Sequence, residues 1–111
     1  MAQRFDNIVV EIAKLRDYCL SDTHPRGRHK ARVFRSRLGM TANDAELLHR
    51  TLLDAARDRQ DELQPTDADE FGQRYVLDFP MTTAAGNAMV RSAWIVLAGQ
   101  DVLRLTSCYV L

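Results

Sequence analysis

The positive charge of this chain gathers in one short segment, Thr23–Gly39. The segment holds six of the fifteen lysine and arginine residues and two of the three histidines, and no acidic residue lies between Asp22 and Asp44. An imidazole exchanges protons near neutral pH, and lysine and arginine neutralise anions. Because the formal net charge of the whole chain is +0, such a concentration of cations indicates a segment suited to an anion, and we expect a nucleic-acid phosphate.

Two residues at the start of this segment have side chains suited to RNA cleavage. Cleavage without a metal ion requires a base for the 2′-hydroxyl, an acid for the 5′-oxygen and cations for the charged intermediate. His24 is the acid–base candidate, because Pro25 after it favours a junction between elements. Lys30 is suited to stabilising the phosphate or to acting as the acid. The alternatives are a turn histidine that caps the next helix and a solvated lysine.

Further candidates lie on a predicted β-hairpin and around the basic helix. Arg91 and Thr106 fall on one face of the hairpin and offer a phosphate clamp and a hydroxyl donor, although ordinary surface positions are the alternative. Four arginines are candidates for contacts to the RNA backbone, which position a strand without reading its sequence. They are Arg26, Arg28, Arg32 and Arg35.

Several other classes of site are not expected. No glycine-rich phosphate loop is present, and the cysteines and histidines lack the spacing of a zinc site, so we expect neither a metal nor a cofactor. No apolar run approaches the roughly 20 residues that span a membrane. Cys19 and Cys108 are read as small packing residues, and with so few cysteines we expect a cytoplasmic, reducing location.

The first half of the chain shows helical periodicity, and its length suits one domain over residues 1–111. Ala31, Phe34 and Leu38 predict the buried face of a helix over 28–38 that ends at Gly39. Thr41 and Asp44 resemble a capping box before a long helix over 42–63. We also expect a short edge strand at 8–10, a short helix over 13–22, and an apolar stripe on the long helix formed by Leu47, Leu48, Thr51, Leu52, Ala55 and Ala56.

The second half changes to strand-like alternation. We predict a loop over 64–72, a strand over 73–79, a hairpin loop over 80–88, and strands over 89–97 and 102–110 around a turn at 98–101. The expected fold is therefore α+β, with two to three N-terminal helices packed on a C-terminal antiparallel sheet of three to four strands.

The register of the last hairpin follows if Gly99 and Gln100 are the central turn residues. One face then pairs Val90 with Tyr109, Ser92 with Ser107, Trp94 with Leu105 and Val96 with Leu103, and this apolar face is the expected core. The other face pairs Arg91 with Cys108, Ala93 with Thr106, Ile95 with Arg104 and Leu97 with Val102. A turn longer by one residue would reverse the faces of one strand.

With these residues in view, the chain resembles a family of small bacterial domains of unknown function, found as stand-alone proteins and at the C-terminal ends of polymorphic toxins. The resemblance covers residues 13–111. It lies in His24-Pro-x-Gly27-x-x-Lys30-Ala31-x-x-Phe34, Leu38-Gly39, Phe71-Gly72-x-x-Tyr75, Val90-Arg91-x-x-Trp94 and Arg104-Leu105-Thr106-x-x-Tyr109.

A second resemblance is to metal-independent ribonuclease toxins of the EndoU, colicin and RelE type. Those proteins place helices with a basic His/Lys segment before an antiparallel sheet whose last strand carries a threonine, and this chain differs by lacking their paired-histidine motif. The resemblance implies a toxin-like endoribonuclease held in check by a cognate antitoxin or immunity protein. It also allows Tyr109, otherwise expected in the core, a catalytic role.

Two functional hypotheses follow. The first is an endoribonuclease in which His24 and Lys30 work against Arg91 and Thr106. The second is a non-catalytic interaction module that binds an acidic partner protein or nucleic acid through the basic residues 24–37. Residues 41–70, with nine acids against three arginines, either offset this charge within the fold or face solvent or a basic partner.

Overall fold

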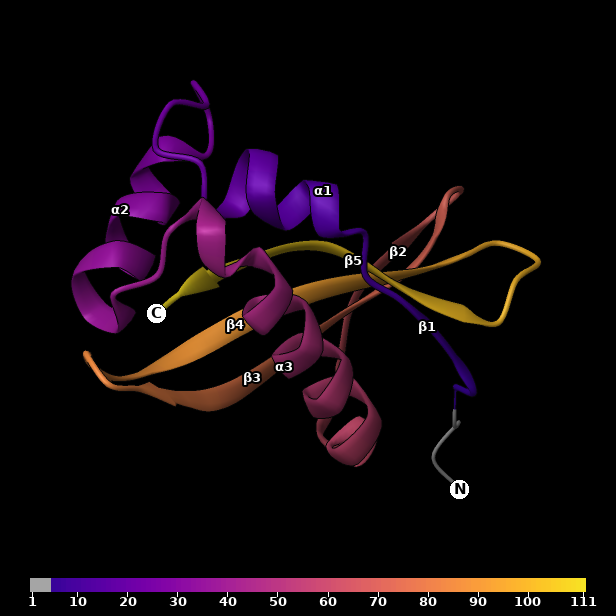
Figure 1. Cartoon of the computed structure of the whole chain (residues 1–111). Helices are drawn as coiled ribbons and strands as arrows, with labels where there is room; N and C mark the ends of the chain where they lie inside the picture. Colours follow the sequence, from indigo (N-terminus) through magenta and orange to yellow (C-terminus); the bar gives the residue numbers. More distant parts are fainter. Residues whose placement is uncertain (1–4) are drawn as a thin grey trace.

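A computed structural model describes residues 5–111. Helical segments dominate the first half and strands the second (Figure 1). In chain order the elements are β1 (Asn7–Val9), α1 (Ile12–Lys14), the π-helical turn η1 (Leu15–Cys19), α2 (Arg28–Leu38), η2 (Ala42–Asp44), α3 (Ala45–Asp58), η3 (Gln60–Glu62), β2 (Gln64–Asp69), β3 (Gly72–Thr83), β4 (Gly86–Leu97) and β5 (Val102–Val110). No helix within residues 5–111 is long and apolar enough to cross a membrane.

The strands form one five-stranded sheet in the order β1-β5-β4-β3-β2. Neighbours pair antiparallel except β1, which runs parallel to β5. The α+β class is therefore confirmed, but the sheet is mixed and the expected three to four strands were too few. The difference is β2, because residues 64–72 were expected to form a loop.

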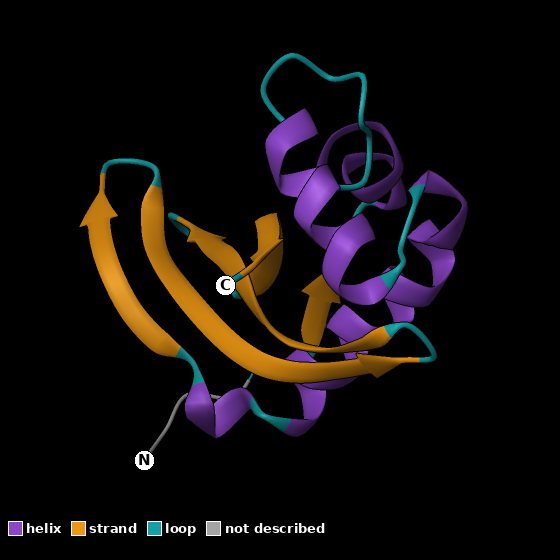
Figure 2. Cartoon of the chain, turned by 90° about the vertical axis from the view of Figure 1, so that its left-hand side faces the viewer, coloured by secondary structure: helices purple, strands orange, loops and turns teal. Residues whose placement is uncertain are grey.

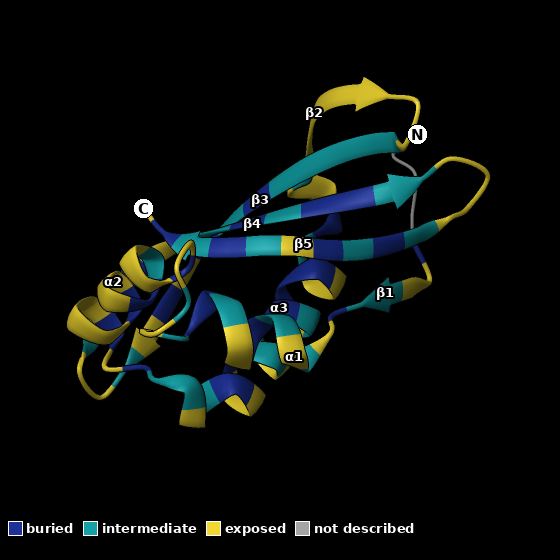
Figure 3. Ribbon diagram, turned by 90° about the horizontal axis from the view of Figure 1, so that it is seen from above, coloured by how far each residue is buried: buried dark blue, intermediate teal, exposed yellow. Residues whose placement is uncertain are grey.

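The sequence pattern did not predict β2, and the reason is physical. All six of its residues are exposed, so the strand has no buried face and no apolar alternation. Pro65 and the acidic residues suit an edge strand, where one side of the backbone needs no partner. Figure 2 shows β2 and the adjoining part of β3 curving away from the helices, and Figure 3 shows the exposure of β2 along its whole length.

The hairpin between β3 and β4 is also longer than expected, and the predicted loop over 80–88 is wrong. The ladder continues to the pair Thr83 and Gly86, which leaves only two residues in the turn. Pro80 fits inside β3 because β2 pairs with β3 only as far as Val76, so no strand within residues 5–111 lies on the side where its N–H is missing. The hydroxyl of Thr83 donates to the carbonyl of Leu38 at 2.7 Å and ties the hairpin to the end of α2.

The helices cover one face of the sheet and bury the core against it (Figures 1 and 3). Helix α2 has the predicted bounds, its buried residues are Ala31, Phe34 and Leu38, and Gly39 ends it with a left-handed φ of 65°. The capping box at Thr41 and Asp44 is confirmed, although it caps the short turn η2 that leads into α3. The predicted long helix is thus divided into η2, α3 and η3. Leu47, expected in its apolar stripe, is 45% exposed.

A β-bulge at Thr106 changes the predicted register of the last hairpin. Trp94 pairs with Leu105 as predicted, but Ala93 pairs with Ser107, which leaves Thr106 as an extra residue in β5. Every later pair shifts by one residue, so that Ser92 pairs with Cys108, Arg91 with Tyr109 and Val90 with Val110. Cys108 consequently faces the core, and Tyr109 faces the same way as Arg91.

Candidate functional site

The face of the sheet turned away from the helices, called the outer face below, carries three cross-strand rows. Strand alternation and register place on it the side chains that oppose the buried ones. The first row is Asp78, Arg91 and Tyr109; the second row is Val76, Ala93 and Ser107; the third row is Arg74, Ile95 and Arg104. A floor of two small apolar side chains and a serine thus separates two polar rows.

An ion pair dominates the first row. The Nε and Nη2 atoms of Arg91 each donate to a different carboxylate oxygen of Asp78 at 2.8 Å, which is the bidentate arrangement. This pair lowers the pKa of Asp78, and the main cause of the lowering is the hydrogen bond from Arg91. It also raises the pKa of Arg91, with Asp78 as the first cause and the neighbouring Tyr109 as the second. At neutral pH the row therefore holds a carboxylate and a guanidinium side by side.

Lys30, which belongs to helix α2, contacts the ring of Tyr109. Its Nζ lies 4.9 Å from the centroid of the Tyr109 ring, a cation–π geometry. Lys30 is half-buried in the first turn of α2, next to the buried Ala31. Beyond Arg104, β5 pairs with no other strand of the described residues on the side away from β4, and α2 packs at this edge. Two cations from distant parts of the sequence therefore flank one phenol.

An open pocket of about 560 Å3 adjoins the first row. Its floor belongs to the outer face and its wall to η3 and the start of β2. Its lining residues are Asp61, Glu62, Gln64, Pro65, Thr66, Val76, Asp78 and Arg91. The wall adds carboxylates near Asp78, so the first row is acidic at that end and cationic at its other end, where Lys30 lies over Tyr109.

His24 has a structural task in the turn before α2. Its Nδ1 accepts hydrogen bonds from the backbone N–H groups of Arg26 at 3.0 Å and Gly27 at 3.1 Å. The ring packs edge-on against Tyr18, with 4.7 Å between ring centroids. Because Nδ1 accepts both bonds, the proton of the neutral ring lies on Nε2. Both bonds lie in the turn directly before α2, which begins at Arg28.

The structure separates the remaining predicted residues. Lys30 and Arg91 meet at Tyr109, whereas the hydroxyl of the exposed Thr106 donates to the carbonyl of Ala93 at 3.1 Å. Sequence reasoning did not select Asp78, although its alternation with the buried Leu77 and Phe79 places it on the face opposite the core.

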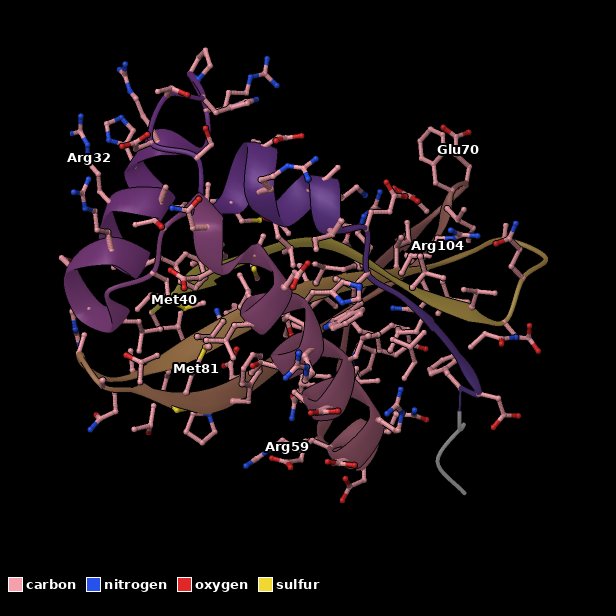
Figure 4. All side chains as sticks on the ribbon, viewed as in Figure 1. Arg32, Met40, Arg59, Glu70, Met81 and Arg104 are labelled. Carbon is pink, nitrogen blue, oxygen red and sulfur yellow. The ribbon has the colours of Figure 1, made fainter. Side chains whose placement is uncertain are left out.

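The four candidate backbone-binding arginines lie outside this cluster. Arg26, Arg28, Arg32 and Arg35 are all exposed, on α2 and the turn before it. Only one forms an ion pair within residues 5–111, between Arg35 and Asp22 at 3.8 Å. Figure 4 shows Arg32 on the outer side of α2, pointing away from the sheet. These side chains form an exposed cationic surface beside Lys30.

The two cysteines lie together beneath the edge of β5. Cys19 and Cys108 are free thiols and both are fully buried. Hydrogen bonding from Cys108 lowers the pKa of Cys19 to about 7, while the same contact and burial raise the pKa of Cys108. Within residues 5–111, no group of three or more His, Cys, Asp and Glu side chains is placed to hold a metal ion.

Comparison with sequence families identifies the chain at the level of a domain. A family described as a domain of unknown function, DUF6883, matches residues 2–111. The chain belongs to this family. A search of the curated proteins found no match. The DUF6883 match spans nearly the whole chain and so includes every residue of the first row and Lys30.

Proposed function

We propose that this DUF6883 domain is a toxin-like endoribonuclease that cleaves RNA without a metal ion, with the first row and Lys30 as its reaction centre. The observation that carries the proposal is the convergence of Lys30 and Arg91 on Tyr109, with Asp78 beside Arg91. The four side chains come from α2, β3, β4 and β5. Together they supply a proton acceptor, a proton donor and two cations, which is the set that the reaction requires.

Each residue has a defined role in the proposed reaction. The Asp78 carboxylate takes the proton of the 2′-hydroxyl, and the 2′-oxygen attacks phosphorus. Arg91 offsets the charge of the pentacoordinate intermediate. The bond to the 5′-oxygen then breaks, and that oxygen takes the proton of the Tyr109 phenol, while Lys30 stabilises the phenolate left behind. The products are a 2′,3′-cyclic phosphate and a free 5′-hydroxyl.

The proposal changes the part assigned to His24. Its acceptor nitrogen holds the turn before α2, and α2 carries Lys30 in its first turn. We therefore assign His24 a positioning role rather than proton transfer. The exposed arginines Arg26, Arg28, Arg32 and Arg35 supply sequence-independent contacts to the phosphates of the substrate. A cognate acidic antitoxin or immunity protein is the partner class that this cationic surface suits.

A non-catalytic interaction module is the second candidate. The exposed arginines favour it, because three of the four form no ion pair within residues 5–111, and exposed cations of this kind are suited to an external anionic surface. Such a module would bind an acidic protein or nucleic acid through α2 and would not need the first row. The two candidates therefore differ in whether substitutions at Tyr109 and Arg91 matter.

The test is cleavage of total tRNA and mRNA by pure protein in EDTA, with the RNA ends analysed for a cyclic phosphate. Tyr109→Phe removes only the hydroxyl and should lower the rate by about 10²- to 10⁴-fold. Tyr75→Phe is the matched control, because Tyr75 is a half-buried tyrosine that packs on Phe5 with 5.9 Å between ring centroids. Thermal melts of each variant separate lost chemistry from lost folding.

The outcomes distinguish the candidates. EDTA-resistant cleavage that falls in Tyr109→Phe and in Lys30→Ala but persists in Tyr75→Phe supports the proposed reaction centre. Cleavage that persists in Tyr109→Phe refutes the assigned mechanism. If no RNA is cut and cells tolerate expression, while RNA binding weakens steeply between about 50 and 200 mM salt, the domain is an interaction module.

A further inference from the structure

The outer face carries three arginines, and two of them have carboxylate partners. Arg74 pairs with Asp69 at 2.6 Å and with Asp67 at 3.5 Å, and Arg91 pairs with Asp78 at 2.8 Å. Arg104, in the third row, forms no ion pair with any residue of the described range 5–111. One guanidinium on this face therefore has no carboxylate partner within residues 5–111.

The Arg104 side chain is also partly withdrawn from water. The residue is half-buried, and its Nε is a buried atom without a hydrogen-bond partner in the described part of the chain. Buried donors and charges in folded proteins are almost always paired, because desolvation without a partner is costly. A half-buried guanidinium without a carboxylate partner in residues 5–111 is suited to an anion from outside the chain, which its accessible end can contact.

The neighbours of Arg104 in the third row are Ile95 and Arg74. Ile95 lies between Arg74 and Arg104 in the third row and is only 8% exposed, although it points away from the helices. The stems of long cationic side chains commonly cover apolar neighbours in this way while their charged ends stay accessible. Arg74 is held by its two aspartates, so Arg104 is the arginine of this row with free donors. Figure 4 shows Arg104 far from Arg32 and the basic surface of α2.

The spacing from the first row suits a polymer rather than a single small anion. Arg104 pairs with Ile95, and Ile95 lies four residues from Arg91 on β4. At about 3.3 Å per residue, the two rows lie roughly 13 Å apart along the strands. Between them the second row has the small Ala93 and Val76 as a floor. A short nucleic-acid strand spans this separation, whereas one inorganic phosphate does not.

We infer that Arg104 forms a second anion subsite, which binds another phosphate of the strand whose scissile phosphate lies at the first row. The inference rests on the proposed function for the identity of the ligand. Arg104 is a binding residue in this scheme and takes no part in proton transfer. It fixes the direction of the strand across the sheet, from Arg91 over Ala93 towards β1.

The test measures binding rather than cleavage. Fluorescence anisotropy follows a labelled 2′-deoxy hexanucleotide, which lacks the attacking hydroxyl, and a dinucleotide with a single phosphodiester. Arg104→Gln should weaken hexanucleotide binding about 3- to 30-fold and reduce the slope of log K against log salt by about 0.7, the value for one phosphate of a single strand. Dinucleotide binding should stay unchanged. Arg50→Gln is the control, because Arg50 is an exposed arginine of α3 on the opposite side of the sheet.

A second substitution separates a binding role from a structural one. Arg104→Met keeps the apolar stem over Ile95, so it should leave the melting temperature unchanged or higher and still weaken the hexanucleotide complex. A native-like affinity in both Arg104 variants, or an equal loss in Arg50→Gln, would overturn the subsite. If Arg104→Gln weakens binding and flattens the salt slope but no RNA is ever cleaved, the subsite stands and the proposed reaction fails.

Discussion

Ser92 gives the sharpest test of how the sheet is held behind the candidate site. It is a buried polar residue with 0% exposure, directly before Trp94 on the inner face of β4. Its Oγ donates to the carbonyl of Leu77 at 2.8 Å and accepts from Nε1 of Trp94 at 2.8 Å. Ser92→Ala removes the acceptor and leaves the indole N–H buried without a partner.

The expected loss follows from these two contacts. An unsatisfied buried donor costs about 1 to 3 kcal/mol, and the lost bond to the Leu77 carbonyl adds about 1 kcal/mol or less. We expect Ser92→Ala to lower the free energy of unfolding by about 2 to 3 kcal/mol. For a domain of this length, each kcal/mol corresponds to about 4 °C, so the melting temperature should fall by roughly 10 °C.

Urea and thermal unfolding by circular dichroism, in a double-mutant cycle with Trp94→Phe, measure the effect. In the Trp94→Phe background no indole N–H remains, so Ser92→Ala should cost about 1 kcal/mol or less. Ser36→Ala is the control, because the exposed Ser36 makes only a 3.4 Å bond to the Val33 carbonyl. A loss below about 0.5 kcal/mol for Ser92→Ala, or the same loss in both backgrounds, would refute the reasoning.

Three further predictions concern the turn before α2, the cap of the next helical segment and the first row. Gly27→Ala should cost about 2 kcal/mol or more in urea unfolding, because the new Cβ would meet the Tyr18 backbone carbonyl; an unchanged midpoint contradicts that contact. Thr41→Ala removes half of a capping box and should lower the melting temperature by about 4 °C, and a smaller shift than Ser36→Ala gives would count against the cap. Arg91 lowers the folded-state pKa of Asp78, so the pair stabilises the fold above the unfolded pKa of about 4, and this is lost as pH falls through the lower folded value. Asp78→Asn should therefore cost about 0.5 to 1 kcal/mol at pH 7, since the pair is 33–37% exposed, and the cost should shrink as the pH falls below about 4; a pH-independent loss would exclude the pair as the cause.

Local periodicity determined a large part of this structure. Ala31, Phe34 and Leu38 predicted the bounds and the buried face of α2, because a helix repeats every 3.6 residues and its caps are local. Alternation and the turn at Gly99 also predicted the bounds of the last strand, Val102–Val110, correctly. Such features depend on neighbours in sequence, so the sequence alone carries them.

The edge of the sheet and the lengths of its hairpins depended on tertiary structure. The exposed strand β2 exists only because β3 offers it a partner, and nothing in its composition separates it from a polar loop. The ladder of β3 and β4 likewise extends through Pro80, because on the side of β3 away from β4 no strand of the described residues pairs beyond Val76. Pairing between distant segments decided both features.

The candidate site also combines features that local sequence predicted with features that only the pairing of distant strands decided. The sequence alone pointed to Lys30 and Arg91 as cations, since their residue types and elements were evident. It did not give the bulge at Thr106, and one extra residue in a strand reverses every later side chain. Tyr109 was therefore expected in the core, and only the folded sheet brings it between Arg91 and Lys30. Alternation has a period of two residues, so the sequence fixes which side chains share a face only when the register of the partner strand is known.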